Sequence, residues 1–460
     1  MVEQHSLGSH SSNIVKSAMR LAHKHRILLL LLAAIAFSVF THWMVMREWH
    51  MPTYGNTMIH VASARHTIEY QQYPLEDYSY GGGIPNLYVP FYRMLVASFA
   101  ILTGFSLDLT SRILVLIFAI LLPLGFYLLG RKLFGETVGM LSAFLSVLPG
   151  ELLIYTVRPL PQAYGLVLLP FAFHAYYKRD WLLSVFLTFA IALIHQEAIA
   201  FLVGGIGMYF GFIILHMIWK VLISQPFDAA KHSQILKISF FIIIFALATY
   251  LLWQFVMIGH FNIFELAQFK NHEGNTTSMD LYLLKTGVLV STFSLIGLFV
   301  CAAIFVRFGI RDLQISEELR NALVTFLVFL LAAFGSYFVL NNFSLSRNVS
   351  LVSISFPFFL GPLEGMEIAA ISLFAGVVAV LMVKGFDHSK FYKSNSSSAY
   401  LFLFALFAAG FFAVKNDAIG LRVFMDRFLV YLQQPLVVLA ALGINSILDF
   451  FRHLRDFHLP

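Results

Sequence analysis

Charged residues are scarce in this chain, and their scarcity limits what the protein can be. Of its 460 residues only 12% are charged, whereas soluble globular domains carry about 25%. Cysteine is scarcer still. Cys301 is the only one, so neither an intrachain disulfide nor a cysteine-based metal site can form. Glycines 81–83 follow no strand pattern and precede no lysine, which excludes a nucleotide-binding P-loop.

Apolar residues, by contrast, make up 59% of the chain and lie in long runs. A helix of about 17 to 25 apolar residues spans a bilayer, and roughly 12 runs approach that length. We therefore expect an all-α polytopic membrane protein with about 12 transmembrane helices. Two further segments, 91–106 and 349–363, are shorter or interrupted by proline and glycine, and we expect re-entrant or interfacial helices there. The spanning runs are 27–46, 112–130, 137–157, 161–177, 182–195, 197–219, 238–258, 282–306, 321–340, 366–383, 399–414 and 427–446.

The basic residues lie in short clusters between these runs, which explains the net charge of +6 without nucleic acid as a partner. If 91–106 and 349–363 do not span, every cluster falls on the side of the N-terminus. Both termini are then expected in the cytoplasm, because cytoplasmic loops retain Lys and Arg. We expect residues 1–460 to form one transmembrane domain with no separate soluble domain. The clusters are Arg131/Lys132, Lys178/Arg179, Lys220 to Lys237, Arg307/Arg311, Lys384 to Lys393 and Arg452/Arg455.

The first extracytoplasmic loop, residues 47–111, is far longer than an ordinary connection between helices, so we expect it to carry function. Asn56 is a good helix N-cap, and residues 56–70 have the spacing of an amphipathic helix. His60 and Ala64 then share a face with Asn56. Pro74 ends the helix, and the following glycines and prolines predict irregular structure.

Several motifs follow one another along the chain. They are Gly55-Asn56 with His60 and Ala64-Arg65, Gly83-x-Pro85 with Tyr88 and Pro90, Leu102 to Ser106, Pro149-Gly150 with Tyr155 and Arg158, and Asp426-Arg427-Phe428. Placed after a single first span, this series resembles the GT-C superfamily of membrane glycosyltransferases, including oligosaccharyltransferases and aminoarabinose transferases. The resemblance is close over the first part of the chain and loose afterwards. It implies a sugar donor on a polyprenyl phosphate or diphosphate, a glycan, lipid or protein acceptor, membrane lipids as partners, and an active face outside the cytoplasm.

One position departs from that family. The resemblance implies a catalytic aspartate in the first loop where this chain has Asn56. An amide can neither act as a general base nor carry the charge that binds a metal ion. Either Glu48 or the Glu76-Asp77 pair supplies the acid, or the chain is a weak or inactive relative. No Trp-Trp-Asp motif is present, so no cofactor is expected, and a divalent metal ion is possible but not favoured.

Transfer from a lipid-linked sugar needs cations that bind the leaving phosphate and a base that takes the acceptor's proton. His195 and Glu197 lie between two apolar runs, where ionisable groups are costly unless they line a functional cavity. Simpler roles stay open, since Arg158 can anchor to lipid headgroups and Arg427 can pair with Asp426. The residues expected at the donor site are His60, Arg158, His195, Glu197, Arg347 and Arg427.

The function expected from the sequence is thus a membrane glycosyltransferase. A lipid-glycan transporter or flippase is an alternative, although the matching halves with broken helices that many transporters have are not visible. A non-catalytic relative that only binds a lipid-linked sugar is a third, which Asn56 keeps open.

Overall fold

A computed structural model describes residues 25–47, 55–77, 84–86, 88–224, 229–258, 285–310, 316, 318–319, 322–326, 396–416 and 425–457. Nearly all of them are helical. The elements are α2 (Arg26–Arg47), α3 (Gly55–Tyr70), β1 (Glu76–Asp77), β2 (Ile84–Pro85), α4 (Phe91–Thr103), α5 (Leu107–Phe134), α6 (Glu136–Leu145), α7 (Gly150–Val157), α8 (Pro161–Lys178), α9 (Trp181–Ile194), α10 (Gln196–Leu222), α11 (Ala229–Ile258), α13 (Val288–Ile310), α17 (Ser396–Val414) and α18 (Met425–Phe457).

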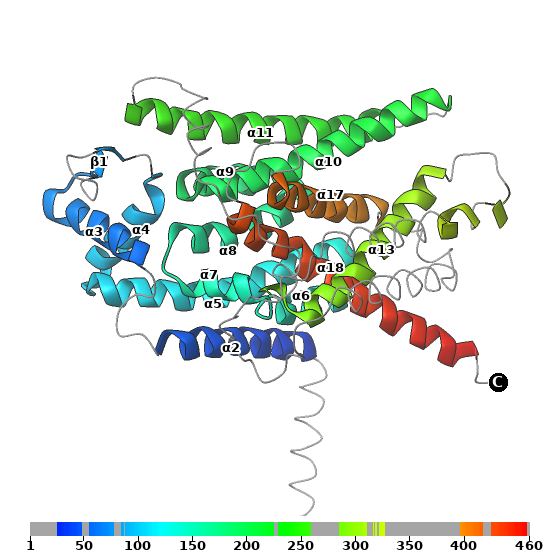
Figure 1. Ribbon diagram of the computed structural model, residues 1–460, viewed down its shortest axis with the longest axis horizontal. Helices are drawn as coiled ribbons and strands as arrows, with labels where there is room; N and C mark the ends of the chain where they lie inside the picture. The colour runs from blue at the N-terminus through cyan, green and yellow to red at the C-terminus, as the bar shows by residue number, and fades with distance from the viewer. Residues whose placement is uncertain are drawn as a thin grey trace, which may run out of the picture.

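The long helices lie side by side in a bundle, with α13 packed along α18, α10 along α17, and α5 against α6 and α8 (Figure 1). Five helices are long and apolar enough to cross a membrane, or six if the bent pair α6–α7 counts as one span. The five are Arg26–Arg47, Leu107–Phe134, Gln196–Leu222, His232–Met257 and Arg427–Arg452.

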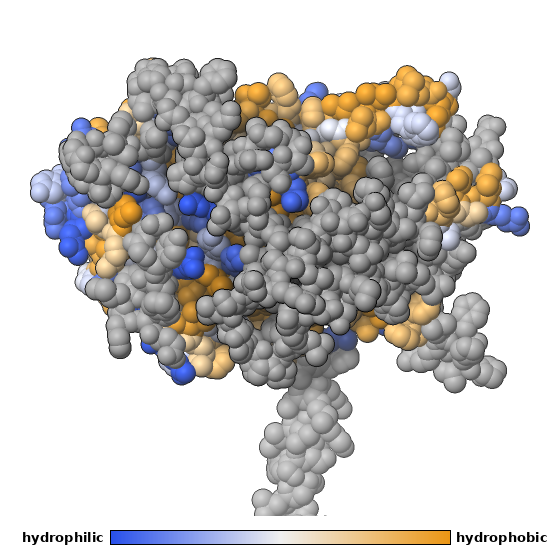
Figure 2. Space-filling model, in the orientation of Figure 1, coloured by the Kyte–Doolittle hydropathy of each residue, from blue (hydrophilic) through white to orange (hydrophobic). Residues whose placement is uncertain are grey.

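The outer helices present apolar side chains to their surroundings, as helices in lipid do. On α11, Phe240, Ile244, Leu252 and Val256 are among the exposed large apolar residues. Figure 2 shows hydrophobic surface along α10 and α11, whereas hydrophilic surface gathers over the first-loop elements at the opposite end. A multi-pass membrane protein accounts for both observations.

Most of the expected spans coincide with helices in the described part of the chain. Helices α5, α8, α9, α10, α11, α13, α17 and α18 lie on the runs identified in the sequence, and the segment 91–106 is the short helix α4. The total of about 12 spans stays a prediction, because the runs 321–340 and 366–383 lie largely or wholly outside the described residues.

The run 137–157 was expected as one span. It consists of two helices, α6 and α7, that are bent by 69° at the break between them, so a single crossing by this pair stays a prediction. Pro149 adopts an extended conformation there, and because it lacks an N–H it cannot continue the hydrogen bonding of α6. The break places Glu151 in the first turn of α7, where its carboxylate pairs with Lys285 Nζ at 2.7 Å.

Different elements form the two ends of the bundle. The C-terminal end of α8 lies beside the starts of α11 and α17, since Arg179 Nη1 donates to Gln234 Oε1 at 2.8 Å and the hydroxyls of Tyr177 and Ser398 are 2.8 Å apart. The basic residues after α8 therefore lie at this end. The first-loop elements α3, β1 and α4 gather at the other end, at the left of Figure 1. Which end faces the cytoplasm stays a prediction.

The helix expected at 56–70 is confirmed as α3, and it packs against α4. One face is buried through Thr57, His60, Val61 and Ala64, at the spacing of an amphipathic helix. Because α3 begins at Gly55, Asn56 lies in the first turn and not at the cap. Two short strands follow, with Glu76 opposite Pro85 in antiparallel register.

Candidate functional site

The site is built from helix ends that two sequence features bring together. Pro159 and Pro161 follow Arg158, whose extended backbone ends α7, and Pro161 opens α8. The residue before a proline avoids the helical conformation, and proline is favoured at the first helical position. This pair therefore separates the two helices by a sharp turn and leaves Gln162 in the first turn of α8.

The second feature is a break at His195. Its backbone is extended, with φ −156° and ψ 127°, so it ends α9 and begins α10. Glu197 is thereby placed in the first turn of α10, where the exposed N–H groups of the helix end favour a negative charge.

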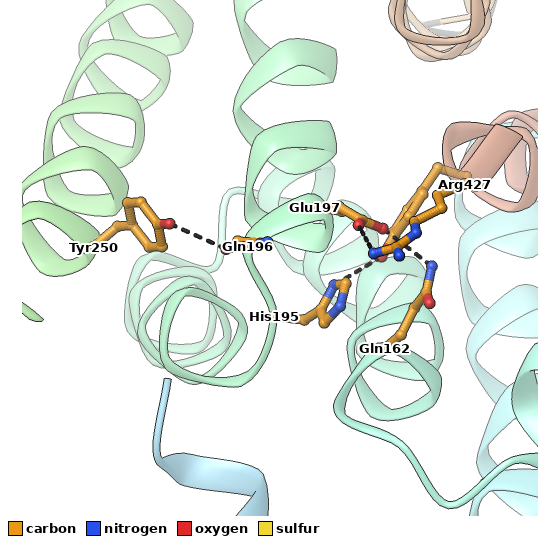
Figure 3. A network of polar contacts seen from close by, with 7 residues as sticks. Gln162, His195, Gln196, Glu197, Tyr250 and Arg427 are labelled. Carbon is orange, nitrogen blue, oxygen red and sulfur yellow. Dashed lines mark hydrogen bonds and ion pairs between the residues drawn. The ribbon is translucent and has the colours of Figure 1, made fainter. Parts of the chain in front are cut away.

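Glu197 is the centre of the polar network in Figure 3. Gln162 Nε2 donates to its Oε2 at 3.1 Å, and Arg427 Nη1 lies 3.5 Å from its Oε1. The Glu197 side chain is 3% exposed, whereas that of Arg427 is 39% exposed. A separation of 3.5 Å is long for a hydrogen bond, so the contact is mainly electrostatic. Glu197 therefore holds the arginine from inside, and the arginine side chain as a whole stays partly exposed.

His195 is held by the same helix that carries Arg427. The hydroxyl of Tyr431, one turn after Arg427 on α18, lies 3.1 Å from His195 Nδ1. Residues four apart share a helix face, so α18 contacts both His195 and Glu197 with one face. Beside them, Tyr250 of α11 donates to Gln196 Oε1 at 3.3 Å (Figure 3).

Arg158 lies near this network. Its guanidinium lies over the ring of Tyr155, 5.1 Å from the centroid. Tyr155 in turn is within Coulomb range of both Glu197 and Arg427. Two arginines from different helices thus flank one tyrosine at the same end of the bundle.

His60 lies in a second polar cluster, formed by α3 and α4. Arg93 Nε donates to His60 Nδ1 at 3.0 Å, and the Tyr88 ring packs against both residues. Burial lowers the pKa of His60 well below its usual range, and the nearby charge of Arg93 lowers it further, with a smaller contribution from His195. His60 is therefore neutral at pH 7. The influence of His195 places the two clusters near one another.

The structure thus brings Glu197, His195 and Arg427 together and places Arg158 and His60 close by. Arg427 pairs with Glu197. From the sequence, the neighbouring Asp426 was the partner considered for Arg427. Asn56 lies in α3 and Asp77 in β1, but their side chains are outside what the structure describes, and so are Glu48 and Arg347 altogether. The role of each stays a prediction.

Sequence reasoning missed several members of these clusters, among them Gln162, Tyr431 and Arg93. Arg93 had a visible signal, as a single charge directly before a stretch of apolar residues. Gln162 and Tyr431 had none, because neither residue type is unusual at a helix end.

A metal site is not evident in the described ranges, where no three His, Cys, Asp or Glu side chains lie close enough together to hold an ion. The expectation that the protein needs no metal ion stays a prediction, because Glu48 and the Asp77 side chain are outside those ranges.

No protein-family model matches the sequence, and no curated protein sequence matches it. Solved structures do match. One is the archaeal oligosaccharyltransferase AglB from Archaeoglobus fulgidus in complex with an inhibitory peptide and a dolichol-phosphate, at 14% identity and a TM-score of 0.49, over 95% of this chain and 52% of that one. The Archaeoglobus fulgidus oligosaccharyltransferase tethered with an acceptor peptide matches at 15% identity and 0.49, over 95% and 51%. Its apo form matches at 17% and 0.47, over 94% and 52%.

This chain therefore spans about half the length of the solved proteins that it matches. Because the TM-scores and the identities are both low, no residue role is carried over from them.

Proposed function

We propose that this protein is an integral-membrane glycosyltransferase that transfers a sugar from a polyprenyl-phosphate-linked donor to an acceptor outside the cytoplasm. One observation carries the proposal. At one end of an apolar helix bundle, the partly exposed guanidinium of Arg427 is fixed from inside by the buried carboxylate of Glu197. A ligand with an apolar tail and an anionic head matches such a place, since its tail lies along the helices and its head meets the cation.

The chemistry of arginine supports a phosphate as that head. A guanidinium presents planar pairs of N–H donors that match phosphate oxygens, and it stays charged at any physiological pH. Arg158 adds a second guanidinium beside Tyr155. Two cations stabilise the charge that develops on the leaving phosphate as the bond to the sugar breaks.

Glu197 is better suited to positioning Arg427 than to taking a proton. Its two carboxylate oxygens are engaged by Gln162 and Arg427, on separate atoms. A base must reach the acceptor's proton with a free oxygen. The base is therefore proposed in the first loop, where Glu48, Asp77 and the position of Asn56 are the candidates.

The first test measures donor binding and transfer with the full chain in lipid nanodiscs, using a radiolabelled polyprenyl-phosphate sugar. Arg427→Gln is expected to weaken donor binding by about 1.5 to 3 kcal/mol, the range for hydrogen bonds to charged groups. Arg452→Gln is the matched control, because Arg452 lies near the opposite end of the same helix and is exposed. Equal affinity in Arg427→Gln and the control would remove Arg427 from the donor site.

The same assay identifies the base and separates the enzyme from its alternatives. Asn56→Asp is expected to raise transfer if the acid is missing from the first loop, because a carboxylate accepts a proton and an amide does not. If Glu48 or Asp77 already serves, Glu48→Gln or Asp77→Asn abolishes transfer and Asn56→Asp changes little. Donor binding without transfer in all of these proteins supports a binding relative, and movement of the lipid across a vesicle without transfer supports a flippase.

A further inference from the structure

Arg93 is the largest fully buried side chain in the described part of the protein, with 1% of its surface exposed. It lies in the first turn of α4 and reaches toward α3 and the first-loop strands. Its Nε donates to His60 Nδ1 at 3.0 Å, and its Nη1 donates to Asn86 Oδ1 at 2.8 Å and to the Tyr73 hydroxyl at 3.1 Å. All of these acceptors are neutral.

Among the residues whose side chains are described, the charge of Arg93 has no counterion. No carboxylate lies within ion-pair distance of it among the residues whose side chains are described, and Nη2 is buried without a hydrogen-bond partner there. The Tyr88 ring, 5.0 Å from the guanidinium carbon, offers a cation–π contact but no negative charge. A buried charge is costly unless it is paired and hydrogen-bonded. Among the described side chains, a negative charge is missing from this environment.

The hydrogen bond from Arg93 also fixes the tautomer of His60. A guanidinium N–H can only donate, so His60 Nδ1 must accept, and the proton of the neutral ring must be on Nε2. His60 is buried, with 5% of its surface exposed. Its Nδ1 is occupied by Arg93 and its Nε2 carries a proton, so the ring cannot serve as a base.

The cluster that holds Arg93 borders the Arg427 network. The edge of the guanidinium that carries Nε also carries Nη2, so the free Nη2 lies on the His60 side. Tyr88, which packs on both residues, is within Coulomb range of Arg427. The cluster is thus next to the proposed donor site but separate from the Glu197 pair.

We propose that Arg93, oriented by His60, forms a second anion-binding site, in the first outer loop, that takes one anionic phosphate oxygen through Arg93 Nη2. Arg93 supplies the positive charge, and His60 Nδ1 holds the guanidinium in place by accepting from Nε. This deepens the proposed function and rests on it for the natural ligand, a polyprenyl phosphate. A free phosphate ion has the same chemistry and is the other source.

The experiment measures equilibrium binding and thermal unfolding of the full chain in nanodiscs, without any sugar present. The ligands are a polyprenyl monophosphate, the neutral polyprenol of the same length, and inorganic phosphate. Arg93→Gln is expected to weaken polyprenyl-phosphate binding about tenfold or more, and to leave polyprenol binding unchanged. Without ligand its melting temperature is expected to stay level or rise, because an unpaired buried charge has been removed. Arg452→Gln again controls for the loss of one positive charge.

A second pair of variants decides the matter if Arg93→Gln does not fold. His60→Gln keeps an oxygen that can accept from Arg93 Nε, and His60→Leu has no acceptor. Weaker phosphate binding in His60→Leu than in His60→Gln supports the site, and equal binding in the two overturns it. Parent-like phosphate binding in folded Arg93→Gln also overturns it.

The ligand arms separate the two sources. Stabilisation by inorganic phosphate that disappears in Arg93→Gln assigns the site to free phosphate, and stabilisation by the lipid alone assigns it to the headgroup. Arg93-dependent binding in a protein that transfers no sugar would reject the proposed function and keep this site. Sugar transfer by a protein whose phosphate binding does not depend on Arg93 would reject this site and keep the proposed function.

Discussion

Removing Arg427 is expected to destabilise the protein more than removing its partner Glu197, because only the carboxylate is deeply buried. The Glu197 side chain is 3% exposed and that of Arg427 39%. Breaking a buried pair by deleting one partner costs about 3 to 5 kcal/mol when the remaining charge has no other solvation. Here Gln162 still donates to the carboxylate, and the Arg427 contact is long at 3.5 Å. We therefore expect Arg427→Met to lower the free energy of unfolding by about 2 to 3 kcal/mol. Glu197→Gln leaves a guanidinium that water can reach, so we expect it to lower the free energy of unfolding by only about 0.5 to 1 kcal/mol.

The assay is equilibrium unfolding of the full chain in detergent micelles, with both single variants and the double variant. The double variant Arg427→Met/Glu197→Gln has no buried charge left over, so it is expected to be more stable than Arg427→Met alone. This sign is a direct measure of the coupling between the two groups. Equal losses in the single variants, or a larger loss for Glu197→Gln, would refute the assignment of Glu197 as the buried partner.

Gly297→Ala is expected to destabilise the protein by about 1 to 3 kcal/mol in the same assay, because the added Cβ would lie 2.0 Å from a backbone oxygen of α18. Gly207→Ala serves as the control, since its added Cβ meets no atom within 4 Å. A lowered His60 pKa means that only the unfolded chain takes up a proton between about pH 6.5 and the folded pKa, so the free energy of unfolding falls as the pH drops through that window. His60→Gln should remove that part of the pH dependence. The groups that face His60 are Arg93, Tyr88, Tyr92 and His195. A cysteine in place of Lys178, which is exposed, is expected to react with impermeant reagents only from the cytoplasmic side; Cys301 is buried and adds little background.

The positions of the helices were predictable because apolar length and helix-end residues are local signals. The helix expected at 56–70 is found at Gly55–Tyr70, and the short run 182–195 is found at Trp181–Ile194. The break inside 137–157 was not predicted. Hydropathy averages over the whole run and does not detect a change of direction, although Pro149 and Gly150 stood at the place where the chain bends.

The partners of the site residues were not predictable in the same way. Arg427 and Glu197 are 230 positions apart in the chain, so their contact depends on how α10 and α18 pack. The sequence could show that each was a rare charge at a helix end. It could not show that one is buried and the other half exposed, which is the difference that separates a positioning carboxylate from a ligand-binding cation.

Arg93 shows where sequence reasoning had the information and did not use it. None of the residues three or four positions from Arg93 is acidic, so no local ion pair on α4 could account for an arginine beside an apolar run. Such a charge must reach water, a distant carboxylate or a ligand. Burial of Arg93 excludes water as its partner, and among the described side chains no carboxylate lies within ion-pair distance of it. The same test, applied to any arginine in a membrane protein sequence, singles out candidate anion sites before a structure is known.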